Sequence, residues 1–395
     1  MIEVEAAERL VLERVRPLEA VAVPLAQALG TVLRQDVTAD ADQPPFDASA
    51  MDGYAARRAD LGAALRVVGE SSAGAAWEGT LAAGQCVRIF TGAPVPAGAD
   101  CVVKQEDTAR EGAVVRALRA VAASHIRRRG ENRRAGAVVV ASGTRLGAAD
   151  LAALAAVGAT RPLVSRPARC VHVATGDELV APDQAPRGAQ IRDSNSVLIA
   201  ALLASHRAEL AGQARVGDDP AAVAAAAERW GACDVLLLSG GAGFGERDPA
   251  RAALQALGYE LVFTELNLRP GKPLLFARRG GQVAFVLPGN PVSHWVVFHL
   301  FVAPLLRALE DGRGAPRPRL TGRLARPDHL PALDGRATYW PCRVEAGAGG
   351  AEVTPLPLAS SGDSAGLAGA NGLLPLPPGA RSVAAGQEVS YLPCP

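Results

Sequence analysis

Acidic and glycine-rich segments follow three predicted strands, and these segments hold the residues best suited to chemistry. They read ATGDEL at 174–179, LSGGAGFGERD at 238–248 and LPGNPVSHW at 287–295. In an open parallel sheet, ligands bind outside the carboxyl ends of the strands, where loops lead into helices. We therefore expect the three loops to cluster at one edge of a sheet. Gly240 and Gly241 offer backbone amides ahead of a predicted helix, an arrangement that can bind a phosphate group. Tight packing of the loop is the alternative.

Carboxylates accompany these loops. Glu178 and Asp248 each lie at the end of a loop, and Asp218 and Asp219 come directly after another predicted strand. Mg²⁺ takes one or two carboxylates together with phosphate oxygens and water, so two acids beside a phosphate-binding loop indicate a magnesium site. The alternative for Asp177, Asp219 and Asp248 is helix N-capping, in which the carboxylate accepts hydrogen bonds from free backbone amides. Acids and glycine-rich loops occur together, and this favours the magnesium site.

Lys272 stands out because lysine occupies only positions 104 and 272, while the other 39 of the 41 basic residues are arginine. It lies in NLRPGKPLLF, between a Pro-Gly turn and an apolar run. An ammonium is compact and fits a tight anion pocket that a planar guanidinium would crowd. A solvated lysine at the start of a strand is the alternative. Ser293, at the start of the last predicted helix, offers a hydroxyl group to the same kind of ligand.

Composition argues against several classes of partner. The formal net charge is +1 and the pI is about 7.7, so no strong field favours nucleic acid or anionic lipid. The first 20 residues contain acids and lack the apolar core of a signal peptide, and no run of about 18 uncharged apolar residues occurs. We expect a cytoplasmic protein.

The six cysteines are far apart and predict reduced, buried thiols rather than a zinc site or a disulfide framework. No metal-ligand spacing joins the six histidines, so we expect each one to be structural or exposed.

The elements that must position these residues follow from the pattern of apolar residues. Apolar spacing predicts a helix over 3–20, and short β-branched runs between Gly and Pro turns predict a β-rich module at about 65–140. A helix over 147–159 should end near Gly158. From about residue 166, strands alternate with helices, which predicts βαβ units on a parallel sheet.

Taken together, these patterns predict a multidomain α/β protein. Residues 1–165 form an N-terminal helical part with an inserted β-rich lobe at about 55–140. Residues 166–311 form the α/β domain, in which a hairpin precedes a long apolar helix. Residues 312–395 return to short strands with Pro and Gly turns, which indicates a small C-terminal β-barrel or sandwich.

The sequence motifs indicate a protein family more specifically than the chemistry of their residues does. In chain order they read PPFDASAMDGYA, RIFTGAPVPAGADCVVKQED, RRRGEN, TGDEL, DSN, SGGAGFGERD, RPGKP and LPGNPVS, with SSGDSAGLAGANGLLPLPPG near the end. This series resembles the molybdopterin molybdenumtransferases, the molybdenum insertases called MoeA in bacteria and represented by the E domain of gephyrin in animals. The resemblance covers nearly the whole chain.

The resemblance implies a fold and an activity. The fold is an elongated homodimer whose subunit has a β-rich lobe inserted in a helical part, a MoaB/MogA-like α/β domain with a parallel-rich sheet, and a C-terminal β-barrel. The activity inserts molybdate into adenylylated molybdopterin and releases AMP with the help of Mg²⁺. A MogA-like molybdopterin adenylyltransferase would act upstream, and molybdoenzyme apoproteins or chaperones would act downstream.

The resemblance also assigns site residues, all numbered here in this chain. The acids with catalytic roles are Asp52, Glu178, Asp218 and Asp248, of which Glu178 and Asp248 also hold the metal. The residues that bind cofactor or substrate are Thr91, Gly92, Arg127, Gly240, Gly241, Arg269, Lys272, Pro273, Pro288, Gly289, Asn290, Pro291, Ser293, Arg336 and Ser361. In this assignment Lys272, Pro273 and Ser293 form the molybdate pocket, to which the C-terminal domain adds Arg336 and Ser361.

The chain departs from the family pattern at several positions. Gly243 and Phe244 replace part of a GGVSxG loop, Glu265 stands where a lysine is common, and Asn132 stands where an acid is common. These changes leave alternatives open: an insertase that uses tungstate, or a divergent paralogue that binds molybdopterin without turnover. A scaffold role like that of gephyrin is disfavoured because the sequence contains no long linker.

Overall fold

The computed structural model describes residues 1–13, 15–241, 248–312, 318–331, 334–347, 349–376, 378 and 383–394. The chain divides into two compact units, which are described separately. Unit 1 comprises Met1–Val21 and Ser165–Pro395, and unit 2 comprises Ala22–Val164. Gly243 and Phe244, two of the family departures, lie outside the described residues.

A six-stranded sheet organises the α/β part of unit 1, in the order β16-β13-β17-β21-β20-β18. Its strands are β13 (Arg169–Thr175), β16 (Glu209–Val216), β17 (Val235–Ser239), β18 (Glu260–Glu265), β20 (Pro273–Arg279) and β21 (Gln282–Leu287). The first four strands in that order run parallel, as predicted. β20 runs antiparallel to both of its neighbours, β21 and β18. Only Gly280 and Gly281 separate β20 from β21, and a two-residue turn can join only antiparallel strands.

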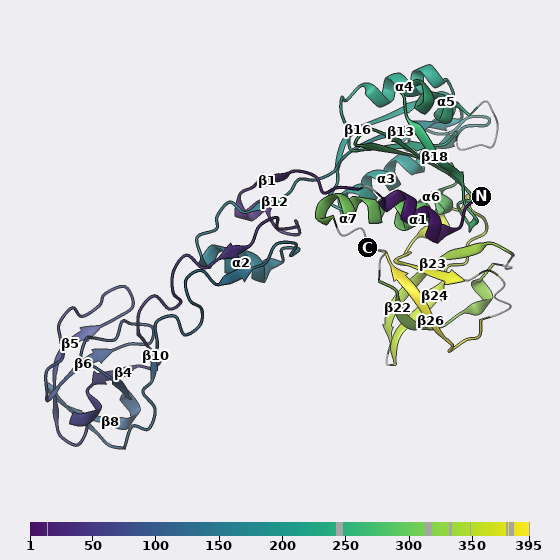
Figure 1. Ribbon diagram of the computed structural model, residues 1–395. Helices are drawn as coiled ribbons and strands as arrows, with labels where there is room; N and C mark the ends of the chain where they lie inside the picture. Colours follow the sequence, from purple (N-terminus) through teal and green to yellow (C-terminus); the bar gives the residue numbers. More distant parts are fainter. Residues whose placement is uncertain are drawn as a thin grey trace. The chain divides into compact units, whose positions relative to one another are not determined.

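Helices cover both faces of this sheet (Figure 1). One face carries α4 (Pro220–Glu228) and α5 (Pro249–Ala256). The other carries α1 (Val4–Leu12), α3 (Ser194–Ser205), α6 (Pro291–Val297), a π-helical segment (Phe298–Val302) and α7 (Ala303–Asp311). The helix predicted over 3–20 is shorter than expected and ends at Leu12. Pro17 cannot continue a helix, and β1 (Ala20–Ala22) is extended instead.

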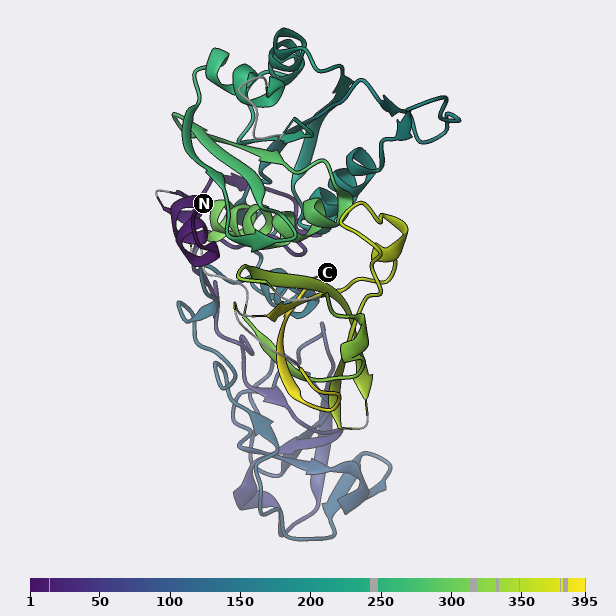
Figure 2. The ribbon, with the colours of Figure 1, turned by 90° about the vertical axis from the view of Figure 1, so that its right-hand side faces the viewer.

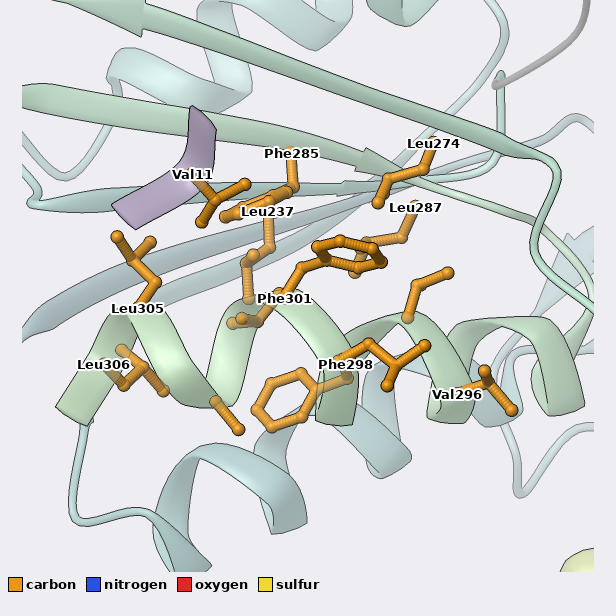
Figure 3. Packing of buried hydrophobic residues seen from close by; sticks show 14 of the residues in the cluster. Val11, Leu237, Leu274, Phe285, Leu287, Val296, Phe298, Phe301, Leu305 and Leu306 are labelled. Atoms are coloured by element: carbon orange, nitrogen blue, oxygen red, sulfur yellow. The ribbon is translucent and has the colours of Figure 1, made fainter. Parts of the chain in front are cut away.

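The largest hydrophobic core lies between the sheet and the helix that runs from Pro291 to Asp311 (Figure 3). Phe301 from the helix packs near Leu237 and Phe285 from the sheet, and all three are at most 1 % exposed. By length and composition this helix is apolar enough to cross a membrane, yet 94 % of its most apolar window is buried inside the protein. Packing against the sheet therefore accounts for its composition.

The C-terminal part of unit 1 is a closed five-stranded barrel, as the sequence predicts (Figure 2). Its strands are β22 (Leu320–Leu324), β23 (Ala337–Gly347), β24 (Gly350–Pro355), β25 (Gly372–Leu376) and β26 (Glu388–Pro393). The barrel closes because β23 pairs with both β24 and β25. A short strand, β19 (Leu268–Arg269), pairs with β23 and so attaches the loop before β20 to the barrel. Unit 1 also contains a two-stranded arm of β14 (Leu179–Val180) and β15 (Ile191–Arg192).

Unit 2 contains a second six-stranded sheet, in the order β7-β4-β6-β5-β9-β8, and this confirms the β-rich module. Its strands are β4 (Gly53–Ala56), β5 (Leu65–Ser71), β6 (Gln85–Ile89), β7 (Cys101–Lys104), β8 (Thr108–Glu111) and β9 (Val114–Ala117). The short strands of this unit include β2 (Val37–Thr38), β3 (Ala48–Ser49), β10 (Ile126–Arg127) and β11 (Val138–Val140), and β12 (Leu163–Ser165) spans its C-terminal boundary. The predicted second helix is α2 (Ala148–Ala156), and Gly158 follows it with φ +70°.

All six cysteines are buried and free, as predicted. Burial raises the pKa of Cys86 and of Cys101 to about 11. These thiols therefore stay protonated at neutral pH and pack as small apolar groups.

Candidate functional site

Three loops leave the sheet side by side, at the carboxyl ends of β13, β17 and β21. The strands are neighbours, and Ser239 is in register with both Ala174 and Leu287. Residues from all three loops line one cavity, so the predicted clustering is confirmed for the described residues.

Two cavities adjoin this edge. The larger, which we call the cationic cavity, has a volume of about 750 Å³. It is lined by the loop before β20, the start of α6 and the barrel, through Arg269, Pro270, Gly271, Lys272, Pro273, Pro288, Gly289, Asn290, Val292, Ser293, Asp328, His329, Leu330, Pro331, Arg336, Trp340, Pro357, Leu358, Ala359, Ser360 and Ser361. The structure thus brings together nine of the predicted binding residues: Arg269, Lys272, Pro273, Pro288, Gly289, Asn290, Ser293, Arg336 and Ser361.

Three cations in the wall of this cavity are paired with acids. Arg336 donates to Asp334 at 2.6 Å from Nη2 and 3.1 Å from Nε, and Arg269 lies 3.4 Å from the same carboxylate. The hydrogen bonds from Arg336 lower the pKa of Asp334 to about 2. The Nζ atom of Lys272 lies 3.8 Å from a carboxylate oxygen of Glu265. The cavity is therefore cationic with its charge partly neutralised.

Hydroxyl groups line another part of the cationic cavity. Ser293, in the first turn of α6, is 5 % exposed, and Ser360 and Ser361 come from the barrel part. The Asn290 side-chain amide donates to the Ser361 hydroxyl at 2.8 Å, and the Val292 amide donates to the Ser361 carbonyl at 3.1 Å. These two bonds hold the start of the helix against the barrel.

The second cavity, of about 390 Å³, is named the acidic cavity because Glu178 and Asp193 line it. Thr175, Ser239 and Gly240 contribute from the strand ends. Gly289 and Asn290 line both cavities, so they form the wall that the two share. Pro291 lines the acidic cavity alone.

Gly240 shows why glycine is required at this edge. It has φ +89°, and a Cβ atom at this position would lie 2.4 Å from the carbonyl oxygen of Thr175. Gly241 has φ +62° and lies against a carboxylate oxygen of Asp248, 3.3 Å from where its own Cβ would be. Any side chain at Gly240 would therefore force the two strand ends apart.

Asp248 is a helix N-cap, the role that the sequence suggested as the alternative to a magnesium ligand. Its Oδ1 accepts from the amide of Arg251 at 3.0 Å at the start of α5, and the residue is 8 % exposed. Asp219 caps α4 in the same way. The prediction for Asp177 as a helix cap is wrong, because β14 and not a helix follows it. Its carboxylate accepts from the amide of Asp218 at 3.2 Å.

Asp218 belongs to the neighbouring strand end. Its Oδ1 lies 2.8 Å from the hydroxyl of Thr175, which lines the acidic cavity. Among the described residues, neither Asp218 nor Asp248 nor Gly241 is part of the lining of the two cavities. Asp218 thus contacts the lining through Thr175, and Asp248 lies behind the Gly240–Gly241 turn.

Asn195 is a cavity residue to which the sequence assigned no role. Its side-chain amide donates to the carbonyl of Gly289 at 2.8 Å, while its Oδ1 is buried without a hydrogen-bond partner. A buried acceptor without a hydrogen-bond partner lowers the stability of the fold. A hydrogen-bond donor or a cation on a ligand in the acidic cavity would satisfy the Oδ1 atom. The DSN motif contains this residue, since Asp193 caps α3 through the amide of Ser196 at 3.0 Å.

Comparison with known proteins settles the family. Residues 2–158 match the MoeA N-terminal region (domain I and II), residues 172–308 match a probable molybdopterin binding domain, and residues 323–394 match the MoeA C-terminal region (domain IV). Molybdopterin molybdenumtransferase 2 from Mycobacterium tuberculosis is 34 % identical over 405 residues, covering 98 % of each chain. The chain belongs to the molybdopterin molybdenumtransferase family.

Other members support the same assignment. A molybdopterin molybdenumtransferase from Nostoc is 34 % identical and covers 94 % of this chain and 88 % of its own. A solved MoeA protein from Pyrococcus horikoshii has a TM-score of 0.85, 28 % identity, and covers 100 % of this chain and 99 % of its own. The whole chain therefore has the molybdenumtransferase fold.

Two buried histidines support the shared wall of this molybdenumtransferase. The Gln213 side-chain amide donates to Nδ1 of His172 at 3.0 Å, so Nε2 carries the proton and donates to the Ser239 hydroxyl at 2.5 Å. That hydroxyl lies 3.5 Å from Nε2 of His294, whose Nδ1 donates to the carbonyl of Pro288 at 3.0 Å. Burial lowers the pKa of His172 to about 3 and that of His294 to about 4. Sequence order gave no signal for this pairing, because 122 positions separate the two histidines.

The remaining predicted site residues of this molybdenumtransferase belong to unit 2. The amide and hydroxyl of Thr91 each donate to Asp52 Oδ1 at 2.8 Å, and these two bonds lower the pKa of Asp52. Gly92 follows with φ +80°, and its amide donates to the carbonyl of Ser49 at 2.8 Å. Arg127 is exposed on β10. Unit 2 therefore presents an ionised, firmly held aspartate.

Two of the predicted site acids are candidate ligands for Mg²⁺. Within the described residues no group of three or more His, Cys, Asp and Glu side chains could hold a metal ion by itself. Glu178 in the acidic cavity and Asp248 behind the adjacent turn supply two carboxylates. Mg²⁺ takes carboxylates of this kind together with several waters and phosphate oxygens from a substrate.

Proposed function

We propose that this chain inserts molybdate into adenylylated molybdopterin and releases AMP, as a step of molybdenum cofactor biosynthesis. One observation carries the proposal: a cationic cavity with an ammonium and serine hydroxyls shares the wall of Gly289 and Asn290 with an acidic cavity at the strand ends. A metal oxyanion and a magnesium-bound phosphate linkage are the two ligands that such a pair of cavities suits.

Molybdate would bind in the cationic cavity. The ammonium of Lys272 and the guanidinium of Arg336 would offset the two negative charges, and the hydroxyls of Ser293 and Ser361 would donate to its oxygens. Lys272 suits this position because an ammonium can approach a small tetrahedral anion more closely than a guanidinium.

The phosphate linkage of the nucleotide would lie at the acidic cavity. Gly240 lines this cavity without a side chain that would obstruct a phosphate group, and the Oδ1 atom of Asn195 would accept a donor from the ligand. Glu178 and Asp248 would hold Mg²⁺. The ion would neutralise charge on the phosphate oxygens and so favour departure of AMP. Asp218 would orient Thr175 beside this linkage. We assign Asp52, Thr91, Gly92 and Arg127 to the same reaction by their match to the family motifs.

Further properties follow from family membership as proposals. The protein would act as a cytoplasmic homodimer. It would receive its nucleotide substrate from a MogA-like adenylyltransferase and deliver the cofactor to apoproteins or chaperones. Mg²⁺ would be required for turnover.

The test is incubation of the purified protein with adenylylated molybdopterin, Mg²⁺ and either molybdate or tungstate, followed by measurement of AMP. AMP release that depends on molybdate supports the proposal, and a clear preference for tungstate would assign the chain to the tungstate alternative. Binding of adenylylated molybdopterin without AMP release under either oxyanion would indicate the non-catalytic paralogue.

A further inference from the structure

Glu265 and Lys272 are held together by the backbone. They stand at the two ends of the loop between β18 and β20, where Glu265 is in register with Pro273 and the Leu266 amide donates to the Lys272 carbonyl at 2.9 Å. The Ile2 amide also donates to the Glu265 carbonyl at 3.0 Å. The loop geometry therefore keeps this acid beside Lys272.

The two carboxylates that pair with the arginine and lysine side chains of the cationic cavity hold these cations with different strength. Asp334 accepts four hydrogen bonds from Arg336, from its amide and its guanidinium, at 2.6 to 3.2 Å. The Nζ atom of Lys272 stands 3.8 Å from Glu265, with the lysine side chain 37 % and the glutamate side chain 31 % exposed. The Lys272–Glu265 pair is therefore the looser of the two, and a ligand can displace it at lower cost.

Glu265 does not line the cavity, whereas Lys272 does. The acid thus draws the ammonium toward the wall and away from an oxyanion. We propose that Glu265 is a built-in counter-ion that competes with the bound oxyanion for Lys272 and thereby sets the oxyanion affinity of the cationic cavity. This inference rests on the oxyanion site of the proposed function. Its physical basis is that an oxyanion must replace an existing ion pair and then stay near a like charge.

The experiment measures equilibrium binding of molybdate, and of sulfate as a second tetrahedral dianion, to the full chain by calorimetry at fixed ionic strength. The variant Glu265→Gln removes the charge and keeps the shape. The matched control is Glu260→Gln, an exposed acid at the other end of the same strand, opposite Arg278, which causes the same change in net charge. We expect Glu265→Gln to bind both anions about two- to tenfold more tightly, and Glu260→Gln to stay within about twofold of the parent chain.

A double-mutant cycle separates competition for Lys272 from a structural effect. If Glu265 acts through Lys272, the gain should vanish in the Lys272→Gln background. Unchanged or weaker binding by Glu265→Gln, or a full gain that persists without Lys272, overturns the inference. If neither the parent chain nor Glu265→Gln binds molybdate, both the proposed oxyanion site and the inference about Glu265 are wrong. Tighter binding by Glu265→Gln without AMP release in the turnover assay would overturn the proposed function while upholding the inference.

Discussion

The side-chain amide of Asn290 donates to the hydroxyl of Ser361 at 2.8 Å and so joins the wall between the two cavities to the barrel. Two segments 71 positions apart in the chain meet at this bond. Since Asn290 is exposed and lies on a loop, the bond positions the wall more than it stabilises the fold.

Asn290→Ala should therefore impair catalysis more than stability. We expect kcat/KM for AMP release to fall about tenfold, because a lost hydrogen bond to a positioned wall costs about 1 kcal/mol and the wall then moves. The melting temperature should change little. A cycle with Ser361→Ala should give a coupling energy of about 0.5 to 1.5 kcal/mol in kcat/KM, and strictly additive effects would mean that the bond has no role in turnover.

Asp248 has a structural role as an N-cap and a proposed role at the metal, and two substitutions separate them. Asn caps a helix about as well as Asp, so Asp248→Asn should fold normally and lose AMP release. Asp248→Ala should lose activity and also about 1 kcal/mol of unfolding free energy. Denaturant unfolding and the AMP assay measure the two effects. Normal turnover by Asp248→Asn would remove the carboxylate from the mechanism.

Lys272→Arg keeps the charge and changes the shape of the cation. The planar guanidinium should crowd the cationic cavity, so we expect the KM for molybdate to rise about tenfold while the KM for adenylylated molybdopterin changes by less than about twofold. Steady-state kinetics with each substrate varied in turn provide the measurement. Equal losses for both substrates would show that Lys272 does not serve the oxyanion specifically.

The buried histidines predict a loss of stability in acid. His172 and His294 have folded-state pKa values of about 3 and about 4, below the ordinary value of 6.5. The unfolded chain therefore binds more protons than the folded chain between pH 6.5 and about 3, and the unfolding free energy falls as the pH drops through this window. We expect a loss on the order of a few kcal/mol between pH 7 and pH 4.

Replacement of one of these histidines tests this explanation. His294→Gln should be less stable than the parent at pH 8, by about 1 kcal/mol for the lost hydrogen bond, yet should lose less stability on acidification. Urea unfolding between pH 8 and pH 4 gives both quantities. If the pH dependence of His294→Gln matches that of the parent, the acid sensitivity arises from other groups.

The sequence by itself determined the elements, the order of the motifs and the family. The apolar periodicities of the α/β part predicted strands β13, β16, β17 and β21 and the helices between them, because burial against a sheet imposes patterns that a single chain displays. The end of the first helix at Leu12 was not predicted, since it depends on how the following segment packs. The hairpin that makes β20 antiparallel to β21 was predicted.

The tertiary structure alone decided which side chains meet. It placed Lys272, Arg336 and Ser293 around one cavity, put Asn195 against the wall of Gly289, and joined His172 to His294 through Ser239. It also set Glu265 beside Lys272. Such pairings arise from the crossing of segments that are distant in the chain. Local propensity cannot report them, because each residue type satisfies the same local rules whether or not its partner is near.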